Sequence, residues 1–184
     1  EGDVCNLPEI CDLARKYKAA VMVDEAHSIG VFGEGGRGVC NHFGRSDEVD
    51  LIMGTFSKPF ASLGGFIACD ETITNFLRHH SRSYIFTASI TPASTAAVDA
   101  ALDIMLNEPE RQEQLWKVTH YALDGFRAMG CEIGNTSTPI IPLYIRDQNK
   151  TFAITAELLN EGIFVNPVVS PAVAPQDTLI RYSL

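Results

Sequence analysis

Two short apolar runs in this chain each end abruptly in polar side chains that can perform chemistry. Val21-Met-Val23 precedes Asp24-Glu-Ala-His27, and Leu51-Ile-Met-Gly54 precedes Thr55-Phe-Ser-Lys58. Such runs are typical of buried parallel strands, and open parallel sheets bind ligands outside the carboxyl ends of their strands. We therefore expect an α/β sheet that brings these polar residues to one crevice. A lysine, an acid and a histidine in such a place indicate aldehyde chemistry.

The composition excludes several classes of protein. A net charge of −9 opposes binding to a nucleic-acid backbone, whose phosphates attract clustered Lys and Arg. The five cysteines are scattered and form no CxxC pair, so the sequence predicts neither a disulfide framework nor a zinc site. No apolar stretch approaches the roughly 20 residues that cross a bilayer, and no signal pattern opens the chain. We expect a cytoplasmic protein with reduced thiols.

Hydrophobic periodicity divides the chain into two parts. In the first, strands alternate with helices: we expect strands at 20–23, 50–53 and 61–69, and helices from 7 to about 17, after 70, and from 92 to about 106. The second has a long amphipathic helix that ends near Gly130, strands at 139–145, 163–169 and 178–184, and a helix at 151–160. These patterns predict a large domain over 1–107 and a smaller α+β domain over 108–184.

The run Asp24-Glu-Ala-His27 also spells the metal-and-ATP motif of a helicase family. A helicase motor additionally needs a GxxxxGK[ST] phosphate loop and basic contacts to nucleic acid, and the sequence contains neither. A DEAH-type ATPase is therefore the disfavoured alternative.

A second set of motifs is more specific. It comprises Val23-Asp-Glu-Ala-His-Ser28, Gly36-Arg37-Gly38, Gly54-Thr55-Phe-Ser-Lys58 with Gly64-Gly65, Tyr84-Ile-Phe-Thr-Ala-Ser89, and Leu179-Ile-Arg181. Together these motifs resemble the pyridoxal-phosphate (PLP) enzymes of the aspartate-aminotransferase fold type, and most closely the α-oxoamine synthases. The resemblance implies the C-terminal portion of a fold-type I PLP-dependent transferase, with a partial, mainly parallel sheet. It covers essentially the whole chain.

The resemblance implies catalytic roles for three residues. Lys58 forms the imine with the cofactor aldehyde and then acts as acid or base. Asp24 pairs with the pyridine nitrogen, and His27 lies near the phenolic oxygen of the cofactor. The residues alone leave ordinary alternatives open for each, namely a surface lysine, a loop cap and a structural histidine.

Six further positions take binding roles from the same resemblance. Ala26 packs beneath the cofactor ring, while Thr55 and, more weakly, Ser57 bind its phosphate. Thr87 and Ser89 match a stretch that reaches the phosphate of a neighbouring subunit, which implies a homodimer with shared active sites. Arg181 matches the arginine that holds the carboxylate of the amino-acid substrate, a role suited to its bidentate fork.

In this family an amino acid condenses with an acyl-CoA, usually with decarboxylation, to give an α-oxoamine. The wording around Lys58 and the run Asn166-Pro-Val-Val-Ser-Pro-Ala-Val-Ala-Pro175 are most similar to the bacterial serine palmitoyltransferases of sphingolipid biosynthesis. Glycine C-acetyltransferase and 8-amino-7-oxononanoate synthase share the same signature and remain alternatives. A partner subunit without catalytic function is a further alternative, which Lys58 opposes.

Both ends of the chain suggest that it lacks the N-terminal part of such an enzyme. It opens on Glu1-Gly-Asp without an initiator Met and stops inside an expected strand. We therefore expect these 184 residues alone to be inactive and to bind the cofactor poorly. The amino acid and the acyl-chain length are not determined by the sequence.

Overall fold

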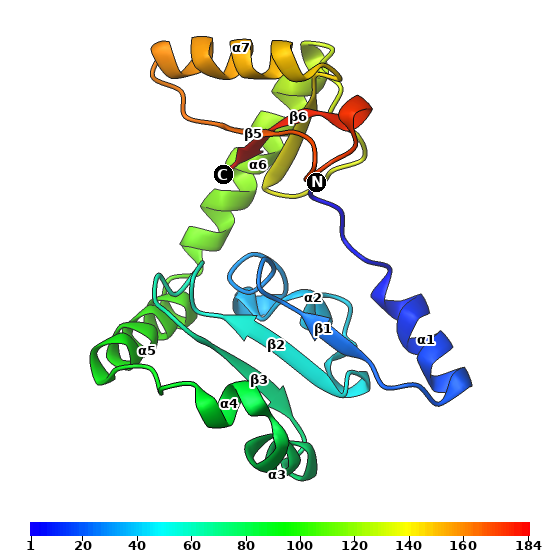
Figure 1. Cartoon of the computed structure of the whole chain (residues 1–184), viewed down its shortest axis with the longest axis vertical. Helices are drawn as coiled ribbons and strands as arrows, with labels where there is room; N and C mark the ends of the chain where they lie inside the picture. Colours follow the sequence, from blue (N-terminus) through cyan, green and yellow to red (C-terminus); the bar gives the residue numbers. More distant parts are fainter. The chain divides into compact units, whose positions relative to one another are not determined.

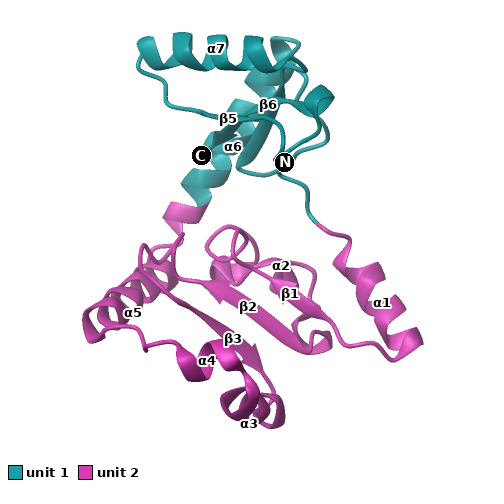
Figure 2. Cartoon of the chain, in the orientation of Figure 1, with its two compact units in different colours: residues 1–4, 113–184 teal, residues 5–112 magenta.

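The computed structural model describes all residues from 1 to 184, which form two compact units (Figures 1 and 2). Unit 2 comprises Cys5–Gln112, and unit 1 comprises Glu1–Val4 together with Glu113–Leu184. The expected assignment of 1–107 and 108–184 to a large cofactor-binding domain and a small domain stays a prediction.

Unit 2 alternates helices and short strands, as the periodicity predicts. Its elements are α1 Leu7–Tyr17, β1 Met22–Asp24, η1 Glu34–Gly36, α2 Val39–His42, η2 Ser46–Glu48, β2 Leu51–Thr55, β3 Gly65–Cys69, α3 Glu71–His80, α4 Arg82–Phe86 and α5 Pro92–Asn107. The start of α5 has a clear local cause, because the Thr91 hydroxyl accepts a hydrogen bond from the Ser94 N–H at 3.2 Å and Pro92 occupies the first turn.

The three strands of unit 2 form one sheet in the order β1-β2-β3. β1 and β2 are parallel, whereas β2 and β3 are antiparallel, with Thr55 opposite Gly65. The sheet is therefore mixed, and the expectation of a mainly parallel sheet is wrong for this portion. Parallel strands need a crossover of about a dozen residues or more, and the connection over 56–64 is too short for one.

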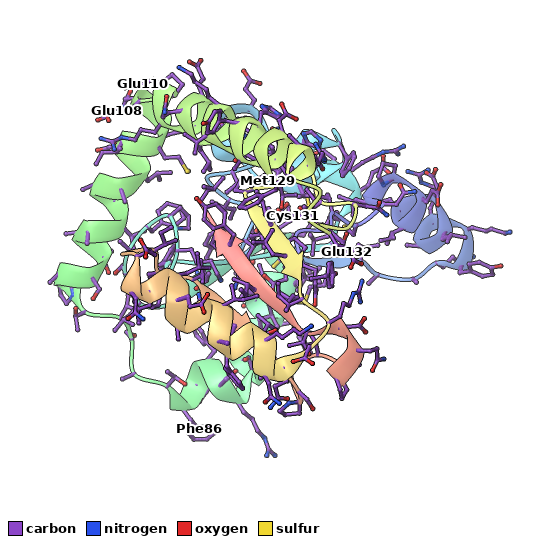
Figure 3. All side chains as sticks on the ribbon, turned by 90° about the horizontal axis from the view of Figure 1, so that it is seen from above. Phe86, Glu108, Glu110, Met129, Cys131 and Glu132 are labelled. Atoms are coloured by element: carbon purple, nitrogen blue, oxygen red, sulfur yellow. The ribbon has the colours of Figure 1, made fainter.

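Two local features of unit 2 differ from the sequence prediction. α4 has too few residues to show a periodic pattern, and the sequence did not predict it. The Ser81 hydroxyl caps this helix by accepting a hydrogen bond from the Tyr84 N–H at 3.4 Å. Figure 3 shows Phe86 projecting outward from this helix. α1 differs from an amphipathic helix with a fully buried apolar face, because only Leu7 and Cys11 are buried and the apolar Ile10 and Tyr17 are exposed.

Unit 1 contains a second, antiparallel sheet in the order β4-β6-β5. Its elements are most of α6 Glu110–Ala128, which begins in unit 2, and then β4 Ile140–Tyr144, α7 Gln148–Asn160, β5 Asn166–Val168, η3 Pro175–Asp177 and β6 Leu179–Ser183. Its buried core consists of Leu123 from α6 with Ile133 and Ile141, and the rings of Phe126 and Tyr182 lie 5.4 Å apart beside it. The amphipathic α6 thus covers one face of the sheet, as its periodicity predicts.

Candidate functional site

The carboxyl ends of β1 and β2 lie side by side in the sheet of unit 2. Asp24 pairs with Met53, and the Glu25 N–H donates to the Met53 carbonyl at 2.8 Å. Thr55 ends β2 two residues after this pair. The structure therefore brings the turn after β1 and the loop after β2 to the same edge of the sheet, where open sheets bind ligands.

The turn after β1 presents an exposed carboxylate. Asp24 Oδ1 accepts a hydrogen bond from the Ala26 N–H at 2.8 Å, which fixes the direction of the side chain. Oδ2 of the same carboxylate takes no part in this hydrogen bond, and the Asp24 side chain is exposed. Ala26 is half-buried, and His27 is exposed at the surface. A small residue and two polar side chains thus follow the strand.

Glu25 has the opposite environment from its neighbour Asp24. Its side chain is completely buried and accepts hydrogen bonds from the Val39 N–H and the Cys40 N–H, both at 2.7 Å, and from the Ser28 hydroxyl. Burial, together with the hydrogen bond to Glu25, raises the pKa of the Cys40 thiol well above its usual range. The sequence alone assigns Glu25 no role.

The loop after β2 carries Lys58, and hydrogen bonds among Thr55, Ser57 and Gly64 hold its base. The Thr55 hydroxyl lies 3.0 Å from the Ser57 hydroxyl and donates to the Gly64 carbonyl at 3.2 Å. The Phe56 N–H also donates to Gly64, at 2.9 Å, which closes the base of the loop. Lys58 is exposed at its tip, and no hydrogen bond or ion pair engages its amine. The loop therefore combines a free primary amine with two hydroxyls that can bind a phosphate.

The other predicted site residues lie elsewhere in the chain. Thr87 and Ser89 are exposed in the segment that follows α4. Arg181 belongs to unit 1, where it lies on β6 between Pro142 of β4 and Asn166 of β5. Its side chain is half-buried, and no hydrogen bond or ion pair engages the guanidinium group. Arg181 is thus available to bind an anion.

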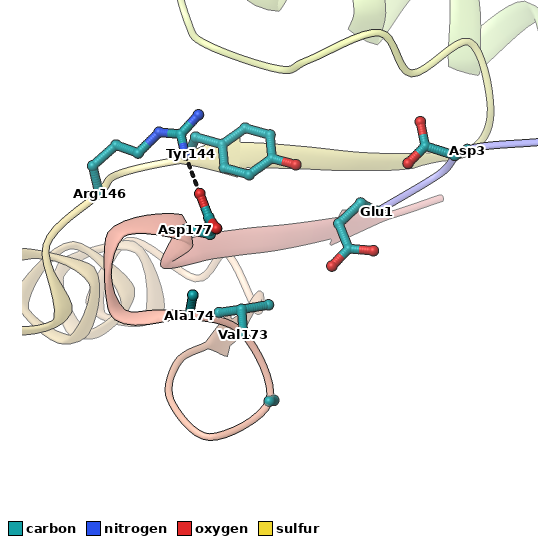
Figure 4. Close-up of a pocket in the computed structure, with 8 residues that line it drawn as sticks. Glu1, Asp3, Tyr144, Arg146, Val173, Ala174 and Asp177 are labelled. Atoms are coloured by element: carbon teal, nitrogen blue, oxygen red, sulfur yellow. Dashed lines mark hydrogen bonds and ion pairs between the residues drawn. The ribbon is translucent and has the colours of Figure 1, made fainter.

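Unit 1 also contains an open cavity of about 460 Å³ that none of the predicted site residues lines. Its wall includes Tyr144, Arg146 and Asp177 (Figure 4). The Arg146 guanidinium lies 4.3 Å from the centre of the Tyr144 ring and donates to Asp177 Oδ1 at 2.6 Å. Arg146 also pairs with Glu132, which lowers the pKa of that carboxyl. These contacts connect the loops around β4 and β6.

The structure contains neither a cluster of metal ligands nor a helix that could span a membrane. No group of three or more His, Cys, Asp or Glu side chains is arranged to hold a metal ion. None of the helices combines the length and the apolar character that crossing a bilayer requires.

Comparison with curated proteins gives strong matches over the whole chain. It is 62% identical over 184 residues to a serine palmitoyltransferase from Bacteroides thetaiotaomicron, covering 100% of this chain and 47% of that protein. It is 41% identical over 181 residues to 8-amino-7-oxononanoate synthase from Petrotoga mobilis, covering 98% of this chain and 46% of that enzyme. The chain spans about half the length of the curated relatives it matches.

Comparison with solved structures supports the same relationship. A serine palmitoyltransferase from S. paucimobilis, described with a bound PLP–myriocin aldimine, matches with a TM-score of 0.94 and 34% identity. The match covers 100% of this chain and 46% of that one. The predicted α/β fold class and the resemblance to this group of enzymes are therefore confirmed.

The family comparison decides between the broad alternatives that the sequence left open. The pattern described as aminotransferase class I and II matches residues 1–184 without a gap at either end. This match excludes the DEAH-type ATPase, which was the disfavoured explanation of the motif at Asp24. The chain belongs to the aminotransferase class I and II family.

Proposed function

We propose that this chain supplies the lysine-bearing part of a PLP-dependent α-oxoamine synthase that condenses serine with a long acyl-CoA and releases carbon dioxide. The observation that carries the proposal is the 62% identity to a serine palmitoyltransferase along the full chain. The identity to 8-amino-7-oxononanoate synthase is lower, at 41%. That enzyme, or glycine C-acetyltransferase, is the second candidate.

The side chains at the edge of the sheet fit the chemistry of PLP. The exposed amine of Lys58 suits an aldehyde carbon, and the exposed carboxylate of Asp24 suits a protonated ring nitrogen. Hydroxyls at Thr55 and Ser57 suit a phosphate, and the small side chain of Ala26 suits the face of a ring. Each part of the cofactor therefore has a matching group in the turn after β1 or the loop after β2.

In this proposal PLP supplies an electron sink for the carbanion that forms at the α-carbon of the amino acid. Asp24 holds the proton on the ring nitrogen, because a carboxylate close to that nitrogen favours its charged form. Lys58 anchors the cofactor and moves the α-proton of the substrate, since its amine has no competing partner. His27 would bind the phenolic oxygen.

Arg181 would bind the carboxylate of the amino acid through its planar, bidentate guanidinium. Its half-buried position on the central strand of the unit 1 sheet supports this role, because the neighbouring strands fix its backbone on both sides. A rigid clamp of this kind holds the substrate in one orientation.

The partners of the enzyme are also proposals. Thr87 and Ser89 are exposed, as expected for hydroxyls that reach the cofactor phosphate of a neighbouring subunit in a homodimer. We further propose a cytoplasmic location, which agrees with the five free cysteines. Inactivity of these 184 residues alone stays a prediction.

The decisive experiment traps the cofactor on its lysine. The full-length protein is incubated with PLP, reduced with borohydride, digested, and analysed by peptide mass spectrometry. We expect a pyridoxyl group on Lys58, its loss in Lys58→Ala, and its retention in the control Lys117→Ala, which changes an exposed lysine on α6. An adduct on another lysine, or none at all, would overturn the proposal and favour a subunit without catalytic function.

A second measurement separates the proposed reaction from that of glycine C-acetyltransferase. The wild-type enzyme is supplied with serine or glycine and with a short or a long acyl-CoA, and the products and released carbon dioxide are identified. We expect serine with the long acyl-CoA to react fastest. A preference for glycine with a short acyl-CoA would instead favour glycine C-acetyltransferase.

A further inference from the structure

Glu25 is a fully buried carboxylate to which the proposed function gives no role. It follows Asp24 directly and begins the turn that contains Ala26 and His27. Burying a carboxylate is tolerated only where it is paired or fully hydrogen-bonded. The position of Glu25 therefore needs a structural explanation.

Both carboxylate oxygens of Glu25 accept hydrogen bonds from backbone N–H groups. Oε1 accepts from the Cys40 N–H and Oε2 from the Val39 N–H, each at 2.7 Å, and the Ser28 hydroxyl also donates to Oε2. Because an amide offers only one acceptor oxygen, a glutamine here would leave one backbone N–H facing an NH₂ group. The site accepts a carboxylate and rejects its closest neutral analogue.

The backbone on the other side of this contact is adapted to the carboxylate. Gly38 has φ +97°, and an added Cβ would lie 2.5 Å from Glu25 Oε2. Only glycine allows the chain to approach so closely in this conformation. The carboxylate therefore joins two segments that are more than ten residues apart, the turn after β1 and the start of α2.

We propose that Glu25 is a positioning residue for the PLP-binding turn, an inference that rests on the proposed function. The Ala26 N–H that orients the Asp24 carboxylate belongs to the peptide group joining Glu25 to Ala26. Glu25 and Ser28, at the two ends of the turn, are connected by the hydrogen bond between their side chains. Anchoring Glu25 thus fixes the direction in which Asp24 faces a cofactor, while Glu25 itself touches no reacting atom.

The test measures cofactor affinity and stability separately in the full-length protein. The dissociation constant of PLP is measured by titrating the apoprotein and following its fluorescence, and the thermal midpoint of the same apoprotein is recorded. For Glu25→Gln we expect the dissociation constant to rise by about tenfold or more, because the geometry of a site is sensitive to small shifts: a misplacement of about 1 Å can lower a reaction rate by about a hundredfold. The pyridoxyl adduct should still form on Lys58 at saturating PLP.

A matched control separates positioning from general stability. Val39→Ala shortens a buried side chain next to the same contact but keeps its backbone N–H, so it should lower the thermal midpoint while the PLP dissociation constant changes less than about twofold. Ser28→Ala removes only the hydroxyl donor and should raise the constant by a smaller factor than Glu25→Gln. If Glu25→Gln fails to fold, the PLP dissociation constant of Ser28→Ala is measured in its place.

Two outcomes would overturn the inference. Wild-type affinity for PLP in Glu25→Gln, or in Ser28→Ala if that variant carries the test, would show that the carboxylate does not position the turn. An equal loss of affinity in Val39→Ala would show that the effect is one of stability alone. Failure of the wild-type protein to bind PLP would overturn the proposed function first, and this inference with it.

Discussion

The clearest quantitative prediction concerns Gly65, where β3 begins opposite Thr55. An added Cβ would lie 2.5 Å from the Gly54 carbonyl oxygen, whereas real Cβ contacts essentially never fall below 3.0 Å. The paired backbones of β2 and β3 would have to separate by at least 3.0 − 2.5, or about 0.5 Å. Shifts forced by an added methylene in a packed core cost about 1–3 kcal/mol, which sets the scale for this contact between paired strands. We expect Gly65→Ala to lose that much stability.

The size of the effect can be checked by thermal unfolding of the full-length protein. At about 2–4 °C per kcal/mol for 150–250 residues, and less for a longer chain, the midpoint should fall by up to roughly 12 °C. Because Thr55 is the partner of Gly65, the affinity for PLP should fall as well. Both effects have one cause, the displacement of β2 at the point where the Lys58 loop begins.

A second glycine provides a control, because its substitution by alanine should raise the stability instead of lowering it. Gly125 lies in α6, is exposed, and has no atom within 4 Å of an added Cβ. Gly125→Ala should therefore stabilise the helix by about 0.5–1 kcal/mol through the lower entropy of the unfolded chain. A wild-type midpoint in Gly65→Ala, or an equal loss in Gly125→Ala, would refute the reasoning from local contacts.

Three further predictions concern the core, an ion pair and the thiols. Ile141→Ala, at a fully buried site in unit 1, should destabilise by about 2–5 kcal/mol in urea unfolding, against about 0.5–1.5 kcal/mol for Ile141→Val. Arg146→Ala should lower the thermal midpoint near neutral pH. Because Arg146 lowers the pKa of Glu132, that difference should shrink as the pH falls below about 4, where the carboxyl becomes protonated. In timed alkylation at neutral pH, exposed Cys131 should react well before Cys40, whose pKa burial raises; equal rates would contradict the buried environment of Cys40.

Much of the fold follows from the sequence because its signals are local. The Thr91-Pro92 pair marks the start of α5, and the long apolar stripe predicts α6. α4 escapes such reasoning, since its five residues contain no periodic pattern. The antiparallel direction of β3 was also missed, although the short connection over 56–64 contains the information.

The candidate site was predictable in part for the same reason. Asp24, Thr55 and Lys58 follow apolar runs directly, and strand pairing brings the ends of those runs together. The role of Arg181 came only from resemblance, because no spacing in the sequence connects residue 181 with residue 58. That role stays a proposal.

Glu25 shows what local patterns omit. Two acids stand side by side after β1, and the sequence does not say which faces a ligand and which faces the core. Successive side chains of an extended chain point to opposite faces of the sheet, so two neighbouring acids have opposite environments: Asp24 is exposed and Glu25 is buried. The available hydrogen-bond donors decide which acid is buried, because a buried carboxylate needs several N–H or O–H groups. Those of Val39 and Cys40 lie 14 and 15 residues further along, beyond the reach of any local motif.

The two acids therefore depend on each other. If Asp24 were the buried one, its shorter side chain would have to reach the same donors, and Glu25 would face the ligand with an extra rotatable bond. A longer side chain loses more conformational freedom when it is held in one position. The observed order instead places the longer acid where three hydrogen bonds fix it, and the shorter acid where one backbone N–H is enough to orient it.

Exchanging the two acids, as in Asp24→Glu combined with Glu25→Asp, should abolish PLP binding even though the net charge and the composition are unchanged. Titration of the apoprotein with PLP would reveal the loss. Retained affinity in that double variant would show that the order of the two acids does not matter.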